Sequence, residues 1–269
     1  MRRVLLATDF SENAHHAIDY ALLLLGDDGL EFILLNTVHF VQNVPEMLIS
    51  LEDIMQEQSE KGLESSVEHM KGQMPALSIE SMSAPGDPSG VIKALADKES
   101  FDLVVLGSQG RSALREAFLG STARSLIHKI SKPLLIVPPG YALKVPQRIV
   151  FGTDLTQVDN LDKLHPLIHF ARKFQAEIIV LNVTGNEDDK QVRGALKKLD
   201  FNRHFSDIKY RFEVVHNPNV LDGILSYIEE NEVDMLVVLP KQYPKFKGLF
   251  HRSLTKRMVY RAEIPLLVF

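Results

Sequence analysis

Hydrophobic and polar positions follow two periods that alternate along the chain. Short, nearly unbroken apolar runs at 4–8, 32–38 and 103–106 suit strands that are buried on both faces of a parallel sheet. Between them lie longer stretches, such as 46–72, in which apolar residues recur three and four positions apart and predict amphipathic helices. Strands that alternate with helices at this pace predict β-α-β units and an α/β fold.

The first half of the chain contains five predicted strands. The three runs above are completed by a weaker strand at 77–82 and by the apolar stretch Leu134–Val137. The helix after the first strand ends at Gly26, and either Ser11 or Asn13 is placed to cap its start.

The second half repeats the first. The run 148–153 corresponds to the first strand, while 233–238 and 264–268 correspond to stretches that lie 132 residues earlier. We therefore predict two copies of one domain, 1–139 and 147–269, joined by a linker that contains two prolines and a glycine. A chain of 269 residues with 45% hydrophobic and 24% charged residues has the length and composition of two folded domains.

A glycine-rich segment separates a buried strand from a helical pattern in the first copy. It contains Gly107, Gly110 and Gly120, followed directly by Ser121 and Thr122, with the spacing G-x2-G-x9-G-S-T. Glycine allows a backbone to approach a phosphate closely, and hydroxyl groups near a helix N-terminus lie where the dipole favours an anion. The segment predicts a phosphate site, and an ordinary tight strand–helix loop is the alternative.

This spacing resembles the nucleotide-binding signature of the universal stress protein family, G-x2-G-x9-G-(S/T). The residues that match are Gly107, Gly110, Gly120 and Ser121, with similar neighbours in Arg111, Phe118, Leu119 and the last strand at 132–137. The resemblance covers both copies. It implies two tandem doubly wound open parallel sheets of strand order 3-2-1-4-5, which are Rossmann-like and adenine-nucleotide α-hydrolase-like.

The same resemblance implies ATP, with or without Mg²⁺, as the ligand and a stress-response sensor or regulator as the function. In this strand order the first and fourth strands are neighbours at the topological switch point, so Asp9 and Gly107 face one crevice. A carboxylate there can accept hydrogen bonds from ribose hydroxyls, and a turn or helix cap is its alternative role. The expected ligand-binding residues are Thr8, Asp9, Thr37, Gly107, Gly110, Arg111, Gly120, Ser121 and Thr122.

The second copy departs from the motif at the same distance of 132 residues. Leu239, Gln242 and Arg252 replace the three glycines, and Pro240 adds a rigid residue without an N–H group. We therefore expect a nucleotide in the first copy only. A run of basic residues takes the place of the lost loop and forms either a solvated surface or a site for an acidic partner, the acidic first half or an anionic ligand: Lys241, Lys245, Lys247, Arg252, Lys256, Arg257 and Arg261.

Charge and composition exclude several other functions. The net charge is −5, and residues 1–140 carry 11 Lys and Arg against 19 Asp and Glu, which argues against general nucleic-acid binding. The absence of cysteine excludes disulfides and thiolate chemistry and fits the cytoplasm. Apolar runs such as 21–25 are too short for a bilayer, and the start of the chain lacks the pattern of a signal peptide. His165 and His169 have i, i+4 spacing, but Pro166 lies between them and no carboxylate pattern completes a zinc motif, so no metal site is expected.

No Ser-His-Asp order, Walker lysine or pair of acid–base carboxylates points to catalysis, so no catalytic residue is expected. The family resemblance implies slow ATP hydrolysis at most. Two alternatives stay open. One is a nucleotide-dependent enzyme of the adenine-nucleotide α-hydrolase-like group, and the other is an interaction scaffold with an empty cavity and an unknown protein partner.

The last strand of each copy lies at a sheet edge in the expected order. An exposed apolar edge is usually paired or covered, and related single-domain proteins are thought to dimerise through this strand. We therefore predict an intramolecular pseudo-dimer in which 134–137 and 266–269 lie side by side, with assembly into a homodimer left open.

Overall fold

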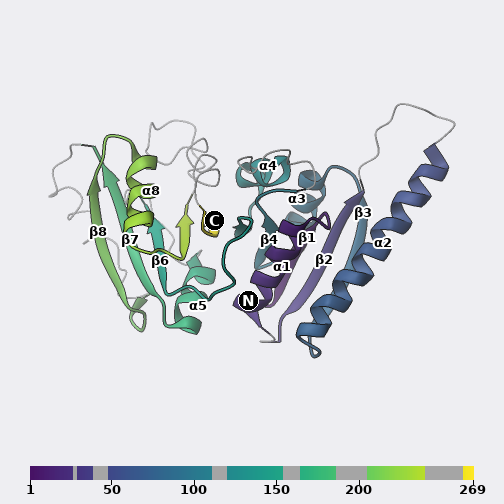
Figure 1. Cartoon of the computed structure of the whole chain (residues 1–269), viewed down its shortest axis with the longest axis horizontal. Helices are drawn as coiled ribbons and strands as arrows, with labels where there is room; N and C mark the ends of the chain where they lie inside the picture. Colours follow the sequence, from purple (N-terminus) through teal and green to yellow (C-terminus); the bar gives the residue numbers. More distant parts are fainter. Residues whose placement is uncertain (27–28, 39–47, 111–119, 154–163, 186–204, 240–262) are drawn as a thin grey trace. The chain divides into compact units, whose positions relative to one another are not determined.

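The chain forms two compact units, Met1–Leu143 and Lys144–Phe269, each with its own set of parallel strands (Figure 1). The boundary falls inside the linker predicted from the sequence. The computed structural model describes residues 1–26, 29–38, 48–110, 120–153, 164–185, 205–239 and 263–269.

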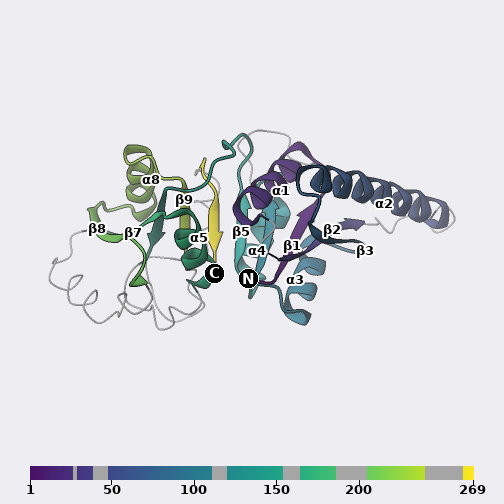
Figure 2. The same cartoon turned by 90° about the horizontal axis from the view of Figure 1, so that it is seen from below.

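Unit 1 alternates strands and helices throughout. Its elements are β1 (Arg3–Thr8), α1 (Glu12–Leu25), β2 (Glu31–Val38), α2 (Leu48–Gln73), β3 (Ser78–Pro85), α3 (Pro88–Lys98), β4 (Leu103–Gly107), α4 (Ser121–Lys129) and β5 (Leu134–Val137). The strands pair in parallel in the order β3-β2-β1-β4-β5. Figure 2 shows α1 and α2 on one face of this sheet and α3 and α4 on the other. The doubly wound sheet and the strand order predicted from the sequence are confirmed.

Unit 2 has the same strand order. Its described elements are β6 (Arg148–Gly152), α5 (His165–Phe174), β7 (Glu177–Thr184), β8 (Tyr210–His216), α8 (Val220–Glu230), β9 (Met235–Val238) and β10 (Leu266–Val268). They pair in parallel as β8-β7-β6-β9-β10. The strand β8 and the helices α5 and α8 were not identified from the apolar pattern.

The apolar runs of the sequence are the buried strands of the two units. Every residue of β5 and β9 is buried, and so are the first four residues of β4. The weaker run became β3, whose side chains are mostly exposed because it lies at the end of the strand order and pairs with β2 alone within its unit.

A buried or half-buried aspartate fixes the start of the first strand in each unit. Asp102 Oδ2 accepts hydrogen bonds from the backbone N–H groups of Arg2 and Arg3, at 2.6 and 3.1 Å. Asp234 Oδ2 accepts two such bonds at the start of β6, at 2.8 and 2.9 Å. The two aspartates lie 132 residues apart, so the repeat extends from the apolar pattern to individual polar contacts.

An asparagine fixes the end of the same strand. Asn36 Nδ2 donates to the carbonyl of Thr8 at 2.7 Å, and Asn182 Nδ2 donates to the carbonyl of Thr153 at 3.0 Å. All four residues are buried. The first strand of each unit is therefore held at both ends by side chains from neighbouring segments.

The boundary between the units has a local cause. Tyr141 packs edge-to-face on Tyr20 of α1, with ring centroids 5.6 Å apart, so the start of the linker belongs to unit 1. Lys144 Nζ lies 2.6 Å from Asp234 Oδ1, so the next part belongs to unit 2. The predicted pairing of β5 with β10 concerns how the two units are placed relative to each other, and it stays a prediction.

Replacing Asp234 by Ala should lower the free energy of unfolding by about 1–3 kcal/mol, because two part-buried backbone N–H groups lose the buried carboxylate that accepts from them. Urea unfolding of the full chain measures the effect. Glu232→Ala is the control, since this side chain is 86% exposed and pairs only with Arg148 in the described contacts, so its loss should change stability little. Equal stability of the two variants would contradict the role of Asp234.

Candidate functional site

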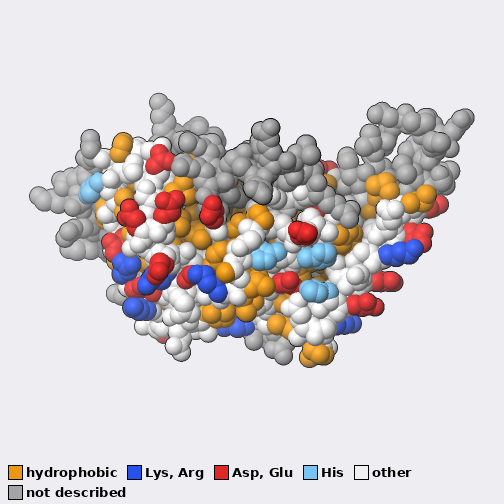
Figure 3. All heavy atoms as spheres, viewed as in Figure 1, with side chains coloured by type: hydrophobic (Ala, Val, Ile, Leu, Met, Phe, Trp, Pro, Cys, Tyr) orange, Lys and Arg blue, Asp and Glu red, His pale blue; other side chains and the backbone are white. Residues whose placement is uncertain are grey.

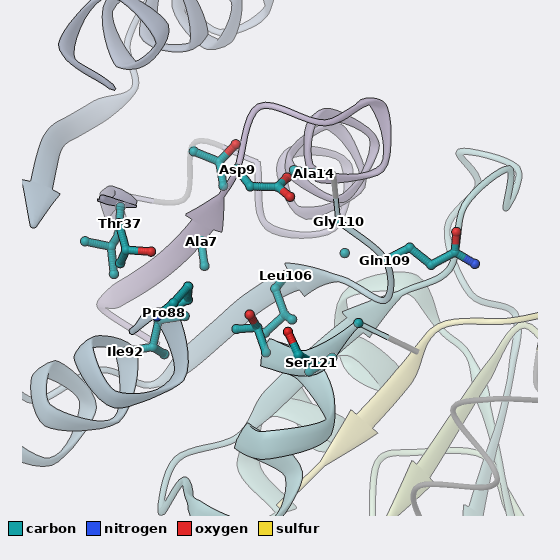
Figure 4. A pocket seen from close by; sticks show the side chains of 16 residues that line it. Ala7, Asp9, Ala14, Thr37, Pro88, Ile92, Leu106, Gln109, Gly110 and Ser121 are labelled. Atoms are coloured by element: carbon teal, nitrogen blue, oxygen red, sulfur yellow. The ribbon is translucent and has the colours of Figure 1, made fainter. Parts of the chain in front are cut away.

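A cavity of about 240 Å³ opens at the carboxyl ends of β1, β2 and β4 in unit 1 (Figure 4). This is the switch point of the sheet, where β1 pairs with β2 on one side and β4 on the other. The predicted site residues that line the cavity are Thr8, Asp9, Thr37, Gly107, Gly110, Gly120, Ser121 and Thr122. The remaining predicted residue, Arg111, lies outside the described residues.

The glycines of the loop after β4 are needed because other atoms come very close. A Cβ atom at Gly107 would lie 2.6 Å from Asn13 Oδ1, and one at Gly120 would lie 3.2 Å from the Ser108 carbonyl oxygen. A Cβ atom at Gly110 would overlap Asp9 Oδ2. None of the three glycines has a left-handed φ angle. Close approach, not backbone handedness, is therefore what these positions require.

Asn13 fixes this loop to the rest of unit 1. Its Oδ1 accepts a hydrogen bond from the backbone N–H of Gln109 at 2.9 Å, and its Nδ2 donates to the Val137 carbonyl at 3.2 Å. The Ser108 N–H donates to the same carbonyl at 2.8 Å. Asn13 is only 8% exposed and so joins α1, the glycine loop and the end of β5 in a buried network.

Sequence reasoning considered Asn13 only as a helix cap and missed this role. The cap is Ser11, whose Oγ accepts a hydrogen bond from Ala14 N–H at 3.2 Å. An asparagine in the first turn of a helix is a common residue near a cap, and its partners lie 96 and 124 positions away. No local signal in the sequence separates the two roles.

Asp9 combines the two roles that the sequence left open. Its Oδ1 accepts a hydrogen bond from Ser11 N–H at 3.1 Å, which is a turn contact. Its Oδ2 lies against Gly110, and the residue lines the cavity. Figure 4 shows Asp9 and Ser121 on opposite sides of the cavity, so the carboxylate faces the start of α4 across the space.

The start of α4 has no side-chain cap. Its N-cap residue is Gly120, whereas Ser11 caps α1 and Asp87 caps α3 through side-chain oxygens. The first backbone N–H groups of a helix have no partner within the helix, and here they are at the cavity together with the hydroxyls of Ser121 and Thr122. This end of the cavity is suited to an anion.

The other walls of the cavity are mostly apolar. They are contributed by the ends of β1, β2 and β4 and by the first turns of α3: Ala7, Leu35, Leu106, Pro88 and Ile92. Figure 4 shows Thr37, Pro88 and Ile92 at the end away from Gln109 and Gly110. The cavity therefore combines an apolar end, a carboxylate and an anion-binding end, which is the set of contacts that a nucleotide offers.

The corresponding region of unit 2 is described only in part. Leu239 follows β9 where Gly107 ends β4, and it is half-buried. Asp154, Pro240, Gln242, Arg252 and the basic run 241–261 lie outside the described residues. The loss of the glycine loop in unit 2 therefore stays a prediction from the sequence.

The described part of the chain contains no group of three or more His, Cys, Asp or Glu residues arranged to hold a metal ion. None of its helices has the length and apolar character needed to cross a membrane.

Comparison with known proteins identifies relatives of the first unit and of the whole chain. The model of the "Universal stress protein family" matches residues 1–138. Universal stress protein MJ0577 of Methanocaldococcus jannaschii is 26% identical over 152 residues, which cover 51% of this chain and 94% of the relative. Universal stress protein Slr1230 of a Synechocystis species is 20% identical over 290 residues, which cover both chains completely.

A solved structure matches the complete fold. The crystal structure of a universal stress protein from Archaeoglobus fulgidus aligns with 99% of this chain and 95% of its own, with a TM-score of 0.77 and 18% identity. At this identity the match concerns the fold alone, and it includes both units. The chain therefore belongs to the universal stress protein family, in the tandem form with two such domains in one chain.

Proposed function

We propose that this protein binds ATP in the cavity of its first unit and acts as a stress-response sensor or regulator. The observation that carries the proposal is the uncapped start of α4 beside glycines whose Cβ positions are already filled by neighbouring atoms. Such a site offers backbone N–H groups and two hydroxyls to a phosphate group without any lysine. The proposal includes a cytoplasmic location, with which the absence of cysteine is compatible.

The remaining walls support a nucleoside next to the phosphates. Asp9 lines the cavity, where its carboxylate can accept hydrogen bonds from ribose hydroxyls. The end of the cavity at Pro88 and Ile92 provides the apolar contact that a purine ring favours. Thr37 lies at this end, where backbone groups would meet the adenine.

We favour binding over catalysis. Of the described residues that line the cavity, Asp9 is the one carboxylate, and none is a histidine, lysine or arginine. A general base must reach the attacking water while the substrate is held, and one carboxylate engaged with a backbone N–H does not obviously do so. Adding ATP to the purified protein and measuring ADP, AMP and pyrophosphate tests this, and rapid production of AMP would favour an enzyme of the adenine-nucleotide α-hydrolase-like group.

The chain should bind one nucleotide, because Leu239, Gln242 and Arg252 replace the glycines of the loop in the second unit. Denaturing the purified protein and analysing the supernatant shows whether nucleotide is carried along. Isothermal titration of the nucleotide-free chain with ATP should then give a stoichiometry close to one per chain. Two equivalent sites would overturn the assignment to the first unit, and no binding at all would favour an interaction scaffold.

Replacing both Gly110 and Gly120 by Val should abolish nucleotide retention, because each Cβ atom would enter space already filled by Asp9 or by the Ser108 carbonyl. Far-UV circular dichroism should stay close to wild type, since neither glycine lies inside a strand. Gly90→Ala on α3 is the control, because its Cβ atom would be 3.5 Å from the nearest atom, which is ordinary contact. A double variant that still copurifies with nucleotide would refute the phosphate-loop assignment.

A further inference from the structure

The residue after Asp9 has an unusual backbone conformation. Phe10 has a φ angle of 61°, in the left-handed region that residues other than glycine, asparagine and aspartate rarely adopt. Its N–H donates to Thr8 Oγ1 at 3.0 Å, which closes a tight turn around Asp9. Strained backbone of this kind persists only where the surrounding structure holds it in place.

Gly62 on α2 provides the place that receives the Phe10 ring. A Cβ atom at Gly62 would lie 2.6, 2.7 and 2.9 Å from Cζ, Cε2 and Cε1 of that ring. Glycine is among the least favourable residues in a helix interior, and Gly62 lies far from both ends of a 26-residue helix. The contact with Phe10 accounts for a glycine at this position.

The inner face of α2 also reaches the residue on the other side of Asp9. Ser59, about one turn before Gly62, donates through Oγ to Asn36 Oδ1 at 2.8 Å. Asn36 in turn donates to the Thr8 carbonyl at 2.7 Å. The charged residues of α2 face outward, where Figure 3 shows acidic and basic side chains interspersed along the helix. The inner face of α2 therefore holds both neighbours of Asp9.

The Asp9–Phe10 turn is confined between two glycines. The Phe10 ring rests on Gly62, and Asp9 Oδ2 occupies the space that a Cβ atom at Gly110 would fill. If the Phe10 ring were displaced, the Asp9 carboxylate could not move toward the loop to compensate, because Gly110 lies directly beside the carboxylate. No described residue of α2 lines the cavity, so Gly62 can affect the site only through residues that α2 contacts, and the Phe10 ring is in contact with Gly62.

We propose that Gly62 and Phe10 are positioning residues of the nucleotide site. The ring seated on Gly62 holds the strained turn that presents the Asp9 carboxylate to the ligand, so the position of α2 sets the affinity of a cavity that it does not line. This inference rests on the proposed function, since it takes ATP as the ligand whose ribose hydroxyls Asp9 accepts.

The test compares Gly62→Ala with Gly72→Ala. Both replacements raise helix propensity on the same helix, but a Cβ atom at Gly72 meets nothing within 4 Å. Titration of each full-length variant with ATP should show about tenfold weaker binding or more for Gly62→Ala, as expected when hydrogen bonds to a charged group are misplaced. Gly72→Ala should bind as the wild type does, and both should keep the wild-type circular dichroism.

A double-mutant cycle shows whether the effect passes through the ring. Phe10→Gly removes the ring and adopts a positive φ without strain. On this background Gly62→Ala should change the affinity by less than about twofold, because nothing is left to displace. An equal loss of affinity with and without the Phe10 ring would overturn the proposal, and so would unchanged affinity in Gly62→Ala alone.

A readout without ligand separates this proposal from the proposed function. The Ser11 amide donates to Asp9 Oδ1 at 3.1 Å, so its NMR chemical shift reports the carboxylate position in the nucleotide-free protein. Gly62→Ala should shift the Ser11 and Gly110 amide signals, and Gly72→Ala should not. A wild-type chain that fails to bind ATP refutes the proposed function, whereas unmoved Ser11 and Gly110 signals refute the positioning role whatever the ligand.

Discussion

The site depends on two positions in the loop after β4, Gly107 and Gly110, where there is no room for a side chain. The parallel order places β1 beside β4, so the segments that follow these two strands share one small volume at the switch point. Asp9 and Asn13 come from the β1 side and fill it, which leaves no room for a Cβ atom at Gly107 or Gly110. Gly107 and Gly110 therefore contribute backbone groups alone, and the cavity has the start of α4 on one side and the Asp9 carboxylate on the other.

Most of the fold and much of the site follow from local signals in the sequence. Buried strands gave unbroken apolar runs, and the glycine spacing marked the loop, so eight of nine predicted site residues line one cavity. Asn13 and Gly62 could not be found in this way. Asn13 resembles a helix cap and Gly62 an unfavourable helix residue, and their partners Gln109 and Phe10 lie far away in the sequence. Such contacts become visible only when the chain is folded.

The two units separate what the fold needs from what the site needs. The aspartate at the start of the first strand and the asparagine at its end make the same contacts in both units. The three glycines of the loop, Gly107, Gly110 and Gly120, have no counterparts at the corresponding positions of the second unit. In unit 1, Asn36 Oδ1 also accepts a hydrogen bond from the Ser59 hydroxyl, so α2 is linked to the end of the first strand.

Both residues of the Phe10–Gly62 contact lower the stability of the fold, Phe10 by its backbone conformation and Gly62 by its place inside a helix. A left-handed φ in a residue other than glycine costs about 1–2 kcal/mol, and glycine in a helix interior costs about 1 kcal/mol relative to alanine. Against a total stability of about 5–15 kcal/mol for a folded domain, these are large costs for a single contact. The two costs occur together, because the Phe10 ring rests where a Cβ atom at Gly62 would lie. Strain of this kind is typical of functional sites, and the residue it holds in place is the carboxylate at the cavity.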